Sequence, residues 1–169
     1  MSQIESSTNP TVLHVRDVAG DYRPAAPEEV LSAAQQMLMA RVRQAEVMSS
    51  PSVVRDFLRM RLGRLEHEVF AVVHLNAQNQ VIEYVELFRG TVTQTSVYPR
   101  EVVKEALARN SAAVLLVHNH PSGTVQPSRA DEALTQTLKA ALALVDVRVL
   151  DHLVVTASEV LSFAERGLL

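Results

Sequence analysis

The sequence predicts an α/β fold of the α+β type, in which helices flank a mixed β-sheet. Several short apolar runs rich in Val and Leu have the length of strands and end at polar turns. From about residue 68 onward these runs and the helical segments follow the order βββαβαβα. With 169 residues, of which 47% are hydrophobic, the chain can build one sizeable core and a short appendage.

The first 48 residues are expected to be a leader and a short helical segment, separate from a main domain over residues 49–169. Two acids directly after Pro27 favour the start of a helix, because they suit the positive end of the helix dipole. The predicted elements are a polar leader over residues 1–10, a strand over 11–18, a turn over 20–27 and a helix over 28–48.

The main domain is expected to open with a helix that ends near Leu62, with Gly63 as its C-terminal cap. A polar turn between two apolar runs then predicts a hairpin. Pro99 stands where the first turn of a helix accepts a proline. The further expected elements are strands over 69–75, 81–88, 91–97, 112–117 and 147–155, and helices over 99–109, 128–144 and 158–166.

Composition excludes several classes of protein. The chain has no Cys, so disulfides and thiolate metal sites are excluded, and a reducing compartment such as the cytoplasm is expected. We find no signal peptide and no apolar run approaching the roughly 20 residues that span a bilayer. The net charge of −3 argues against a general polyanion binder, although six arginines lie between Arg41 and Arg64. These form either a solvated helical face or contacts to phosphates.

Three zinc-binding side chains follow the apolar run over residues 112–117. His118 and His120 are two residues apart, so in extended backbone both rings point to one side. Asp131 follows eleven residues later, and with Ser128 it has the spacing of a helix capping box. Two His and one Asp leave a zinc position free for water, as hydrolytic zinc sites require. Each part of this set also has an ordinary structural explanation when it is taken alone. The two histidines could be core residues, and Ser128 with Asp131 could be only a helix cap.

A zinc hydrolase also needs a general base that is not a metal ligand. Glu66, Glu68, Glu83 and Glu86 are candidates, and spacing alone does not choose among them. Other histidines have less support. His152 opens the last strand as a structural residue or a neighbour of the site, and His74 is left out because it lies roughly 20 Å from Glu68 along an extended strand.

These residues resemble the JAMM motif of MPN-domain metalloproteins, and more closely its RadC-like branch. The similarity covers roughly residues 50–169. It is carried by these segments: Leu75-Asn76, Gly90-Thr91, Tyr98-Pro99-Arg100-Glu101, His118-Asn119-His120-Pro121-Ser122-Gly123, Pro127-Ser128, Asp131 and Asp151-His152-Leu153.

The resemblance implies an MPN fold of cytidine-deaminase-like architecture and a zinc site made by His118, His120 and Asp131. It also implies that Glu68 accepts a proton from the attacking water. Ser128 would help to stabilise the oxyanion. The implied activity is that of a metallopeptidase, which hydrolyses amide or isopeptide bonds in a protein or peptide substrate that the sequence does not identify.

Two departures from the family pattern limit this expectation. The chain resembles a short form, without the glycine-bearing helix-hairpin-helix region that longer RadC-like proteins carry, since Gly20 is the only glycine before Gly63. Asn119 stands where deubiquitinating relatives have Ser or Thr, and the following loop is short. A ubiquitin-specific isopeptidase is therefore not expected. Two alternatives stay open: a DNA-repair accessory protein with a structural or vestigial metal site, and a non-catalytic MPN scaffold.

Overall fold

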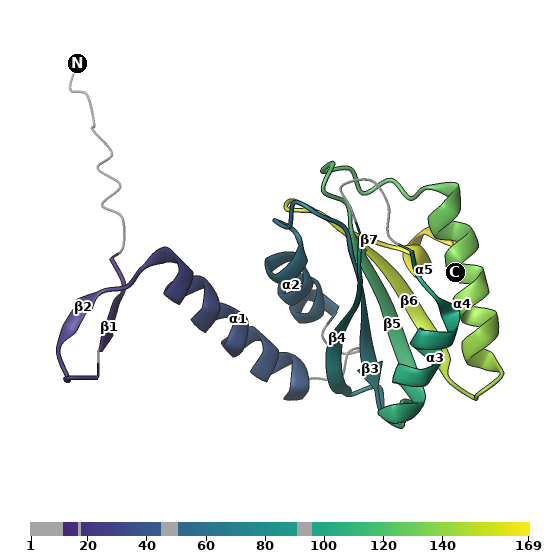
Figure 1. The fold of residues 1–169 in the computed structure, drawn as a ribbon, viewed down its shortest axis with the longest axis horizontal. Coiled ribbons are helices and arrows are strands. Elements are labelled where there is room, and N and C mark those ends of the chain that lie inside the picture. Colours follow the sequence, from purple (N-terminus) through teal and green to yellow (C-terminus); the bar gives the residue numbers. More distant parts are fainter. Residues whose placement is uncertain (1–11, 17, 45–50, 91–95) are drawn as a thin grey trace, which may run out of the picture. The chain divides into compact units, whose positions relative to one another are not determined.

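The computed structural model describes residues 12–16, 18–44, 51–90 and 96–169, without the side chains of residues 41–44. The chain divides into two compact units between Met37 and Leu38 (Figure 1). Three expectations lie outside the described residues: the leader over residues 1–10, the end of the first helix after residue 44, and residues 91–95 of the third strand.

The N-terminal unit begins with a small antiparallel hairpin. β1 (His14–Arg16) pairs with β2 (Tyr22–Pro24), and Gly20 takes a positive φ of 99° in the turn between them. Among the described residues of the strand predicted over 11–18, only His14–Arg16 form a strand, so this strand is shorter than expected. The expected turn over residues 20–27 is partly wrong, because it contains β2.

α1 (Pro27–Gln44) starts in the N-terminal unit at the proline that the sequence indicated. Its first turn carries Glu28 and Glu29. The Glu29 carboxylate accepts a hydrogen bond from the Ala26 backbone N–H at 2.8 Å and pairs with Arg23 at 2.6 Å. This acid satisfies a backbone donor that the helix leaves open at its start, as the predicted acidic opening requires.

The C-terminal unit is built on a five-stranded mixed sheet of order β4-β3-β5-β6-β7. The pair β5 and β6 is parallel, and the other neighbours in the sheet are antiparallel. This confirms the predicted mixed sheet flanked by helices. The strands are β3 (Val69–Leu75), β4 (Val81–Arg89), β5 (Ala113–Asn119), β6 (Arg148–Val155) and β7 (Val160–Ser162).

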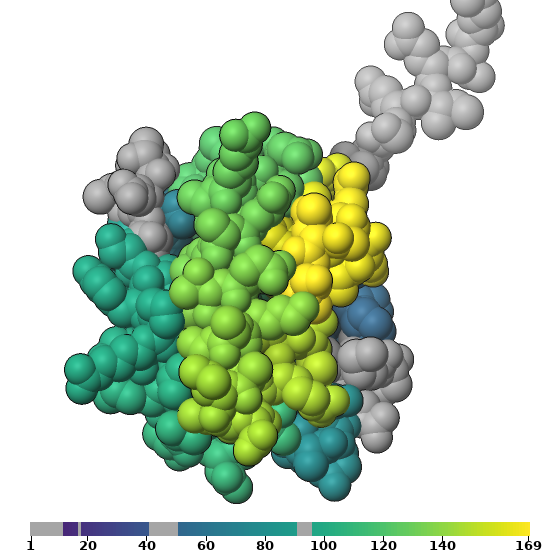
Figure 2. All heavy atoms as spheres, turned by 90° about the vertical axis from the view of Figure 1, so that its right-hand side faces the viewer, coloured from purple at the N-terminus to yellow at the C-terminus, as the bar shows by residue number. Residues whose placement is uncertain are grey.

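Helices cover both faces of this sheet (Figure 1). α2 (Pro51–Leu62) packs on one face, and α3 (Pro99–Ala108) and α4 (Arg129–Ala143) pack on the other. Alternate residues of β3 and β5 point to opposite faces, so both strands are buried throughout and read as continuous apolar runs. Figure 2 shows the face that α4 crosses, between α3 and the C-terminal segment.

The C-terminus differs from the predicted helix over residues 158–166. Val160 and Leu161 pair with the end of β6, and α5 (Phe163–Arg166) begins only after them. The Ser162 hydroxyl accepts a hydrogen bond from the Glu165 backbone N–H, which caps the short helix. The helical expectation is confirmed for residues 163–166 but wrong for residues 158–162, where pairing with a distant strand outweighs local helix propensity.

Gly63 is required for a different reason than predicted. It does not take the left-handed conformation of a C-terminal cap glycine. A Cβ at this position would lie 2.6 Å from the carbonyl oxygens of Arg59 and Thr156. The glycine therefore permits the close approach of the end of α2 to the segment after β6. Within the described ranges, no helix combines the length and apolarity needed to cross a membrane.

Candidate metal centre

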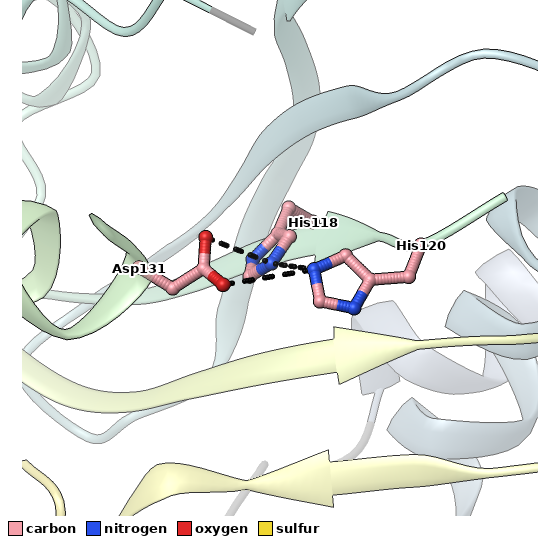
Figure 3. A group of neighbouring side chains, drawn as sticks. All are labelled: His118, His120 and Asp131. Carbon is pink, nitrogen blue, oxygen red and sulfur yellow. Dashed lines mark hydrogen bonds and ion pairs between the residues drawn. The ribbon is translucent and has the colours of Figure 1, made fainter. Parts of the chain in front are cut away.

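His118, His120 and Asp131 converge at the carboxyl end of β5. His118 is the penultimate residue of β5 and His120 follows directly after it, while Asp131 projects from the first turn of α4. The His120 backbone N–H donates to the Val155 carbonyl at 3.0 Å, which holds the chain against β6 beyond the strand end. Figure 3 shows the two rings and the carboxylate pointing toward one another.

The separations of these three side chains suit a small cation. The Nε2 atoms of His118 and His120 are 3.0 Å apart, and they lie 3.4 and 3.6 Å from the Asp131 carboxylate oxygens. Two ligand atoms bound to one tetrahedral zinc ion would be about 3.3 Å apart. The three donors therefore fit zinc in number, type and spacing, and this set could hold a metal ion.

The hydrogen bond of His120 determines which of its nitrogens faces the centre. Its Nδ1 lies 2.8 Å from the Thr124 carbonyl oxygen, which can only accept, so Nδ1 carries the proton. Nε2 of the neutral ring then presents a lone pair toward His118. The pKa of His120 is raised, first by its contact with the Asp131 carboxylate and then by its hydrogen bond to the Thr124 carbonyl, against the effect of burial.

Asp131 is kept ionised by its surroundings. Burial alone would raise the pKa of this carboxyl, but the contacts from His118 and His120 outweigh burial and hold the pKa well below its usual range. The N–H and the hydroxyl of Ser128 both donate to Asp131 Oδ2 at 2.7 Å. Both bonds turn the carboxylate toward the histidines while it caps α4.

Ser128 thus forms the predicted capping box. Its Oγ accepts from the Asp131 N–H at 3.1 Å, and its own proton is directed at the Asp131 carboxylate. In this arrangement the side chain orients a candidate metal ligand. Its role toward an oxyanion stays a prediction, and the residue does line the cavity described next.

An open cavity of about 620 Å³ extends over the three donors. Of the four glutamates considered as a base, Glu68 is the one that lines it. Glu83 and Glu86 instead form ion pairs with Arg109 and Arg61. Glu68 precedes β3 by one residue and is close enough to raise the pKa of His120 by its charge. Phe70, Val97, Ala130 and Leu134 provide the apolar part of the wall.

Two side chains lie behind His118: His152, which sequence analysis named without assigning it to the site, and Thr135, which it missed. His152 of β6 is fully buried, and its Nε2 lies 2.8 Å from His118 Nδ1. Thr135 of α4 is also fully buried and contacts His152 Nδ1 at 2.6 Å. Burial lowers the pKa of His152 far below its ordinary value, and the neighbouring charge of His118 adds to this effect. His152 is therefore a neutral neighbour of the candidate ligands, which is one of the two roles that sequence analysis considered.

Asn119 connects the end of β5, which carries the candidate ligands, to Glu68. Its side chain is 1% exposed and lies between the two histidines in sequence. The amide oxygen accepts from the Val69 N–H at 2.7 Å, and the amide nitrogen donates to the His67 carbonyl at 3.1 Å. These two groups flank Glu68, so Asn119 holds the backbone on both sides of the candidate base. Sequence analysis included Asn119 in a segment shared with the RadC-like branch and noted it as a departure from deubiquitinating relatives, but gave it no role.

His74 does not join the centre, as expected from the sequence. It lies near the other end of β3, paired in register with Val114 of β5, whereas Phe70 is the partner of His118. Its Nδ1 contacts Ser111 Oγ at 2.9 Å. The structure therefore separates the buried histidines of the sheet into two groups.

Comparison with known proteins gives one consistent result. The family described as the RadC-like JAB domain matches residues 48–168. A UPF0758 protein of Leptothrix cholodnii is 63% identical over 150 residues, which cover 89% of this chain and 68% of that protein. Relatives from Aromatoleum aromaticum and Polaromonas are 62% and 55% identical, over 84% and 96% of this chain and 64% and 72% of theirs. The chain thus spans about two thirds of the length of these relatives.

Proposed function

The chain belongs to the RadC-like JAB domain family, and we propose that it is a zinc-dependent hydrolase that cleaves amide bonds in a protein or peptide. One observation carries this proposal. The Nε2 atoms of His118 and His120 face each other at 3.0 Å beside the ionised Asp131 carboxylate, inside an open cavity. Such a set of ligands, with room beside it for water and substrate, is typical of hydrolytic zinc sites.

Zinc, when bound, would activate a water molecule as a nucleophile near neutral pH and polarise the substrate carbonyl. His118, His120 and Asp131 would hold it. Glu68 is proposed as the group that accepts the proton of the attacking water and passes it to the leaving amine. Its position on the cavity wall and the fixation of its flanking backbone by Asn119 support this role.

Ser128 is proposed to act at the oxyanion in addition to capping α4. Its hydroxyl lies at the cavity wall, and rotation about its side-chain bond would turn the proton from Asp131 toward a developing negative charge. The backbone N–H of Ser128 also donates to Asp131, so the carboxylate would keep one hydrogen bond during that rotation.

The arginines of α2 give little support to direct binding of nucleic acid. Arg55 pairs with Glu165, Arg59 with Asp56, and Arg61 with Glu86. These pairs agree with the alternative that this is a solvated, charge-balanced surface. We retain a cytoplasmic location as a proposal, resting on the absence of Cys from the sequence.

The test compares Glu68→Gln with Glu66→Gln as a matched control. Both proteins are expected to bind about one zinc per chain, as measured by elemental analysis. Hydrolysis of a library of fluorescence-quenched peptides should fall by about 100-fold or more in Glu68→Gln, the usual contribution of a positioned base. Glu66→Gln should cleave as the unchanged protein does. Equal cleavage by both variants would remove Glu68 from the mechanism.

A further inference from the structure

We propose that Thr135 and His152 are positioning residues that select the protonated nitrogen of His118 and thereby set the affinity of the centre for zinc. The proposal rests on the metal-binding part of the proposed function and is independent of hydrolysis. The two side chains come from α4 and β6, and both are fully buried behind the metal-binding face.

The contacts form a continuous chain from the helix backbone to the metal-binding nitrogen. Thr135 Oγ1 is 2.6 Å from the Asp131 carbonyl oxygen and 2.6 Å from His152 Nδ1. His152 Nε2 is 2.8 Å from His118 Nδ1. The other nitrogen of His118, Nε2, is the atom that faces His120 and Asp131.

The backbone carbonyl at one end decides the direction of every hydrogen bond in the chain. A carbonyl oxygen can only accept, so Thr135 uses its single hydroxyl proton on Asp131. Thr135 must then accept from His152, which places the proton of this neutral ring on Nδ1. His152 Nε2 accepts in turn from His118 Nδ1–H. The remaining nitrogen of His118 therefore carries a lone pair, as a zinc ligand must.

The opposite set of directions is unfavourable. If Thr135 donated to His152, its oxygen would face the Asp131 carbonyl oxygen at 2.6 Å with no proton between them. His152 would then donate to His118, and the neutral His118 ring would carry its proton on Nε2, where it would block the metal. The short contact between the Thr135 oxygen and the carbonyl thus selects the tautomer that binds zinc.

Packing also fixes the His152 ring in the required orientation. Phe70 contacts it edge-on, with ring centroids 5.8 Å apart, and Phe163 lies on another side at 4.7 Å. Asp131 closes the network, because its carboxylate faces His118 while its backbone carbonyl starts the chain of hydrogen bonds. Asp131 of α4 is therefore one of the three ligands and, through its backbone carbonyl, also fixes the proton position of a second ligand, His118.

The experiment measures zinc affinity by competition with a chromophoric chelator in the full chain. Thr135→Val keeps the side-chain shape but removes the hydroxyl, and zinc should bind about 10- to 100-fold more weakly. Thr135→Ser should restore affinity to within a few-fold. The matched control is Thr137→Val, because Thr137 makes the same hydroxyl bond to the carbonyl four residues back on the exposed face of α4. Zinc affinity in this control should not change.

A second measurement reads the tautomers directly and would not respond to a merely structural role. Long-range ¹H–¹⁵N spectra of the metal-free protein, in which no metal dictates the tautomer of His118, are expected to show both His118 and His152 protonated on Nδ1. In Thr135→Val, His152 should lose its clear preference for that nitrogen. Unchanged zinc affinity in Thr135→Val, or a His152 protonated on Nε2 in the unaltered protein, would overturn the proposal. Failure to bind zinc in the unaltered protein would instead reject the proposed function, while the spectra without metal would still report the His152 tautomer.

Discussion

The two ends of β3 and β5 contain buried histidines in very different surroundings. At the carboxyl end of β5, His118 and His152 have a partner on each ring nitrogen and lead to an open cavity. At the opposite end, His74 bonds to Ser111, and its Nε2 is the single buried side-chain nitrogen or oxygen atom without a hydrogen-bond partner among the residues that the structure describes. Burial of an imidazole therefore does not make a site. A candidate metal site needs several donor atoms that converge on one point and whose hydrogen bonds fix which nitrogens carry protons.

The largest effect should follow from removal of a ligand at the metal-binding end. Asp131→Ala deletes the only carboxylate in the donor set, and zinc affinity should fall by more than the roughly 100-fold typical of residues that support ligands. Glu132→Ala, which alters the next acid in the same first turn of α4, is the matched control and should bind zinc normally. Equal affinities, measured by chelator competition, would show that the metal binds elsewhere.

Asn119 tests what holds the metal-binding end together. Asn119→Ala removes both hydrogen bonds to the backbone beside Glu68 and leaves the buried Val69 N–H and the half-buried His67 carbonyl without these partners, so the protein should lose about 1–3 kcal/mol of stability. Hydrogen exchange of the Val69 amide should accelerate, while zinc content stays near one per chain. Urea unfolding and exchange measurements check both expectations. A slowly exchanging Val69 amide in the variant would mean that Asn119 does not fix this segment.

His74, which lies apart from the candidate metal centre, predicts a pH dependence of the protein's stability. Burial, followed by the charge of Arg109, lowers the pKa of His74 from 6.5 to about 4. Below pH 6.5 the unfolded chain binds a proton at this residue that the folded chain does not, so stability falls as the pH drops toward 4. Between pH 7 and pH 5 this loss should be about 2 kcal/mol.

His74→Leu should remove that part of the pH dependence while leaving zinc binding unchanged. The measurement is the difference in unfolding free energy between the two proteins at pH 7 and pH 5, because all other titrating groups cancel. If the two proteins lost stability in parallel, burial of His74 would not be the cause.

The smallest effect is expected on the surface of α2, away from both histidine groups. Arg59→Ala combined with Arg61→Ala removes two exposed ion pairs, each worth at most about 1 kcal/mol. Zinc affinity should not change, and neither should any weak association with duplex DNA. A large, salt-dependent loss of DNA binding in this variant would favour the accessory role over the hydrolase.

Local patterns explain why the sequence indicated the three candidate ligands that the structure brings together. His118 and His120 share a side because strand residues alternate, and Ser128 with Asp131 forms a cap through neighbouring residues alone. Glu68 could be selected only by resemblance, because its distance from the histidines depends on the pairing of β3 with β5. His152 depends in the same way on the register of β5 with β6, in which it lies opposite Leu116, two positions before the partner of His118.

The errors have the same origin. The expected C-terminal helix has local helix-forming residues, but Val160 and Leu161 extend the sheet by pairing with β6. Gly63 looks like a helix cap in the sequence, yet the Thr156 carbonyl, which is 93 positions away, excludes a side chain there. Contacts between distant parts of the chain decided each of these cases.

The most direct test of the account is a crystal structure of the zinc-loaded protein with anomalous diffraction recorded at the zinc edge. We expect one strong peak in contact with the Nε2 atoms of His118 and His120 and with the Asp131 carboxylate, and with Glu68 facing it across the cavity. Zinc bound through His118 Nδ1, or a peak at another position with these three residues unoccupied, would contradict the account.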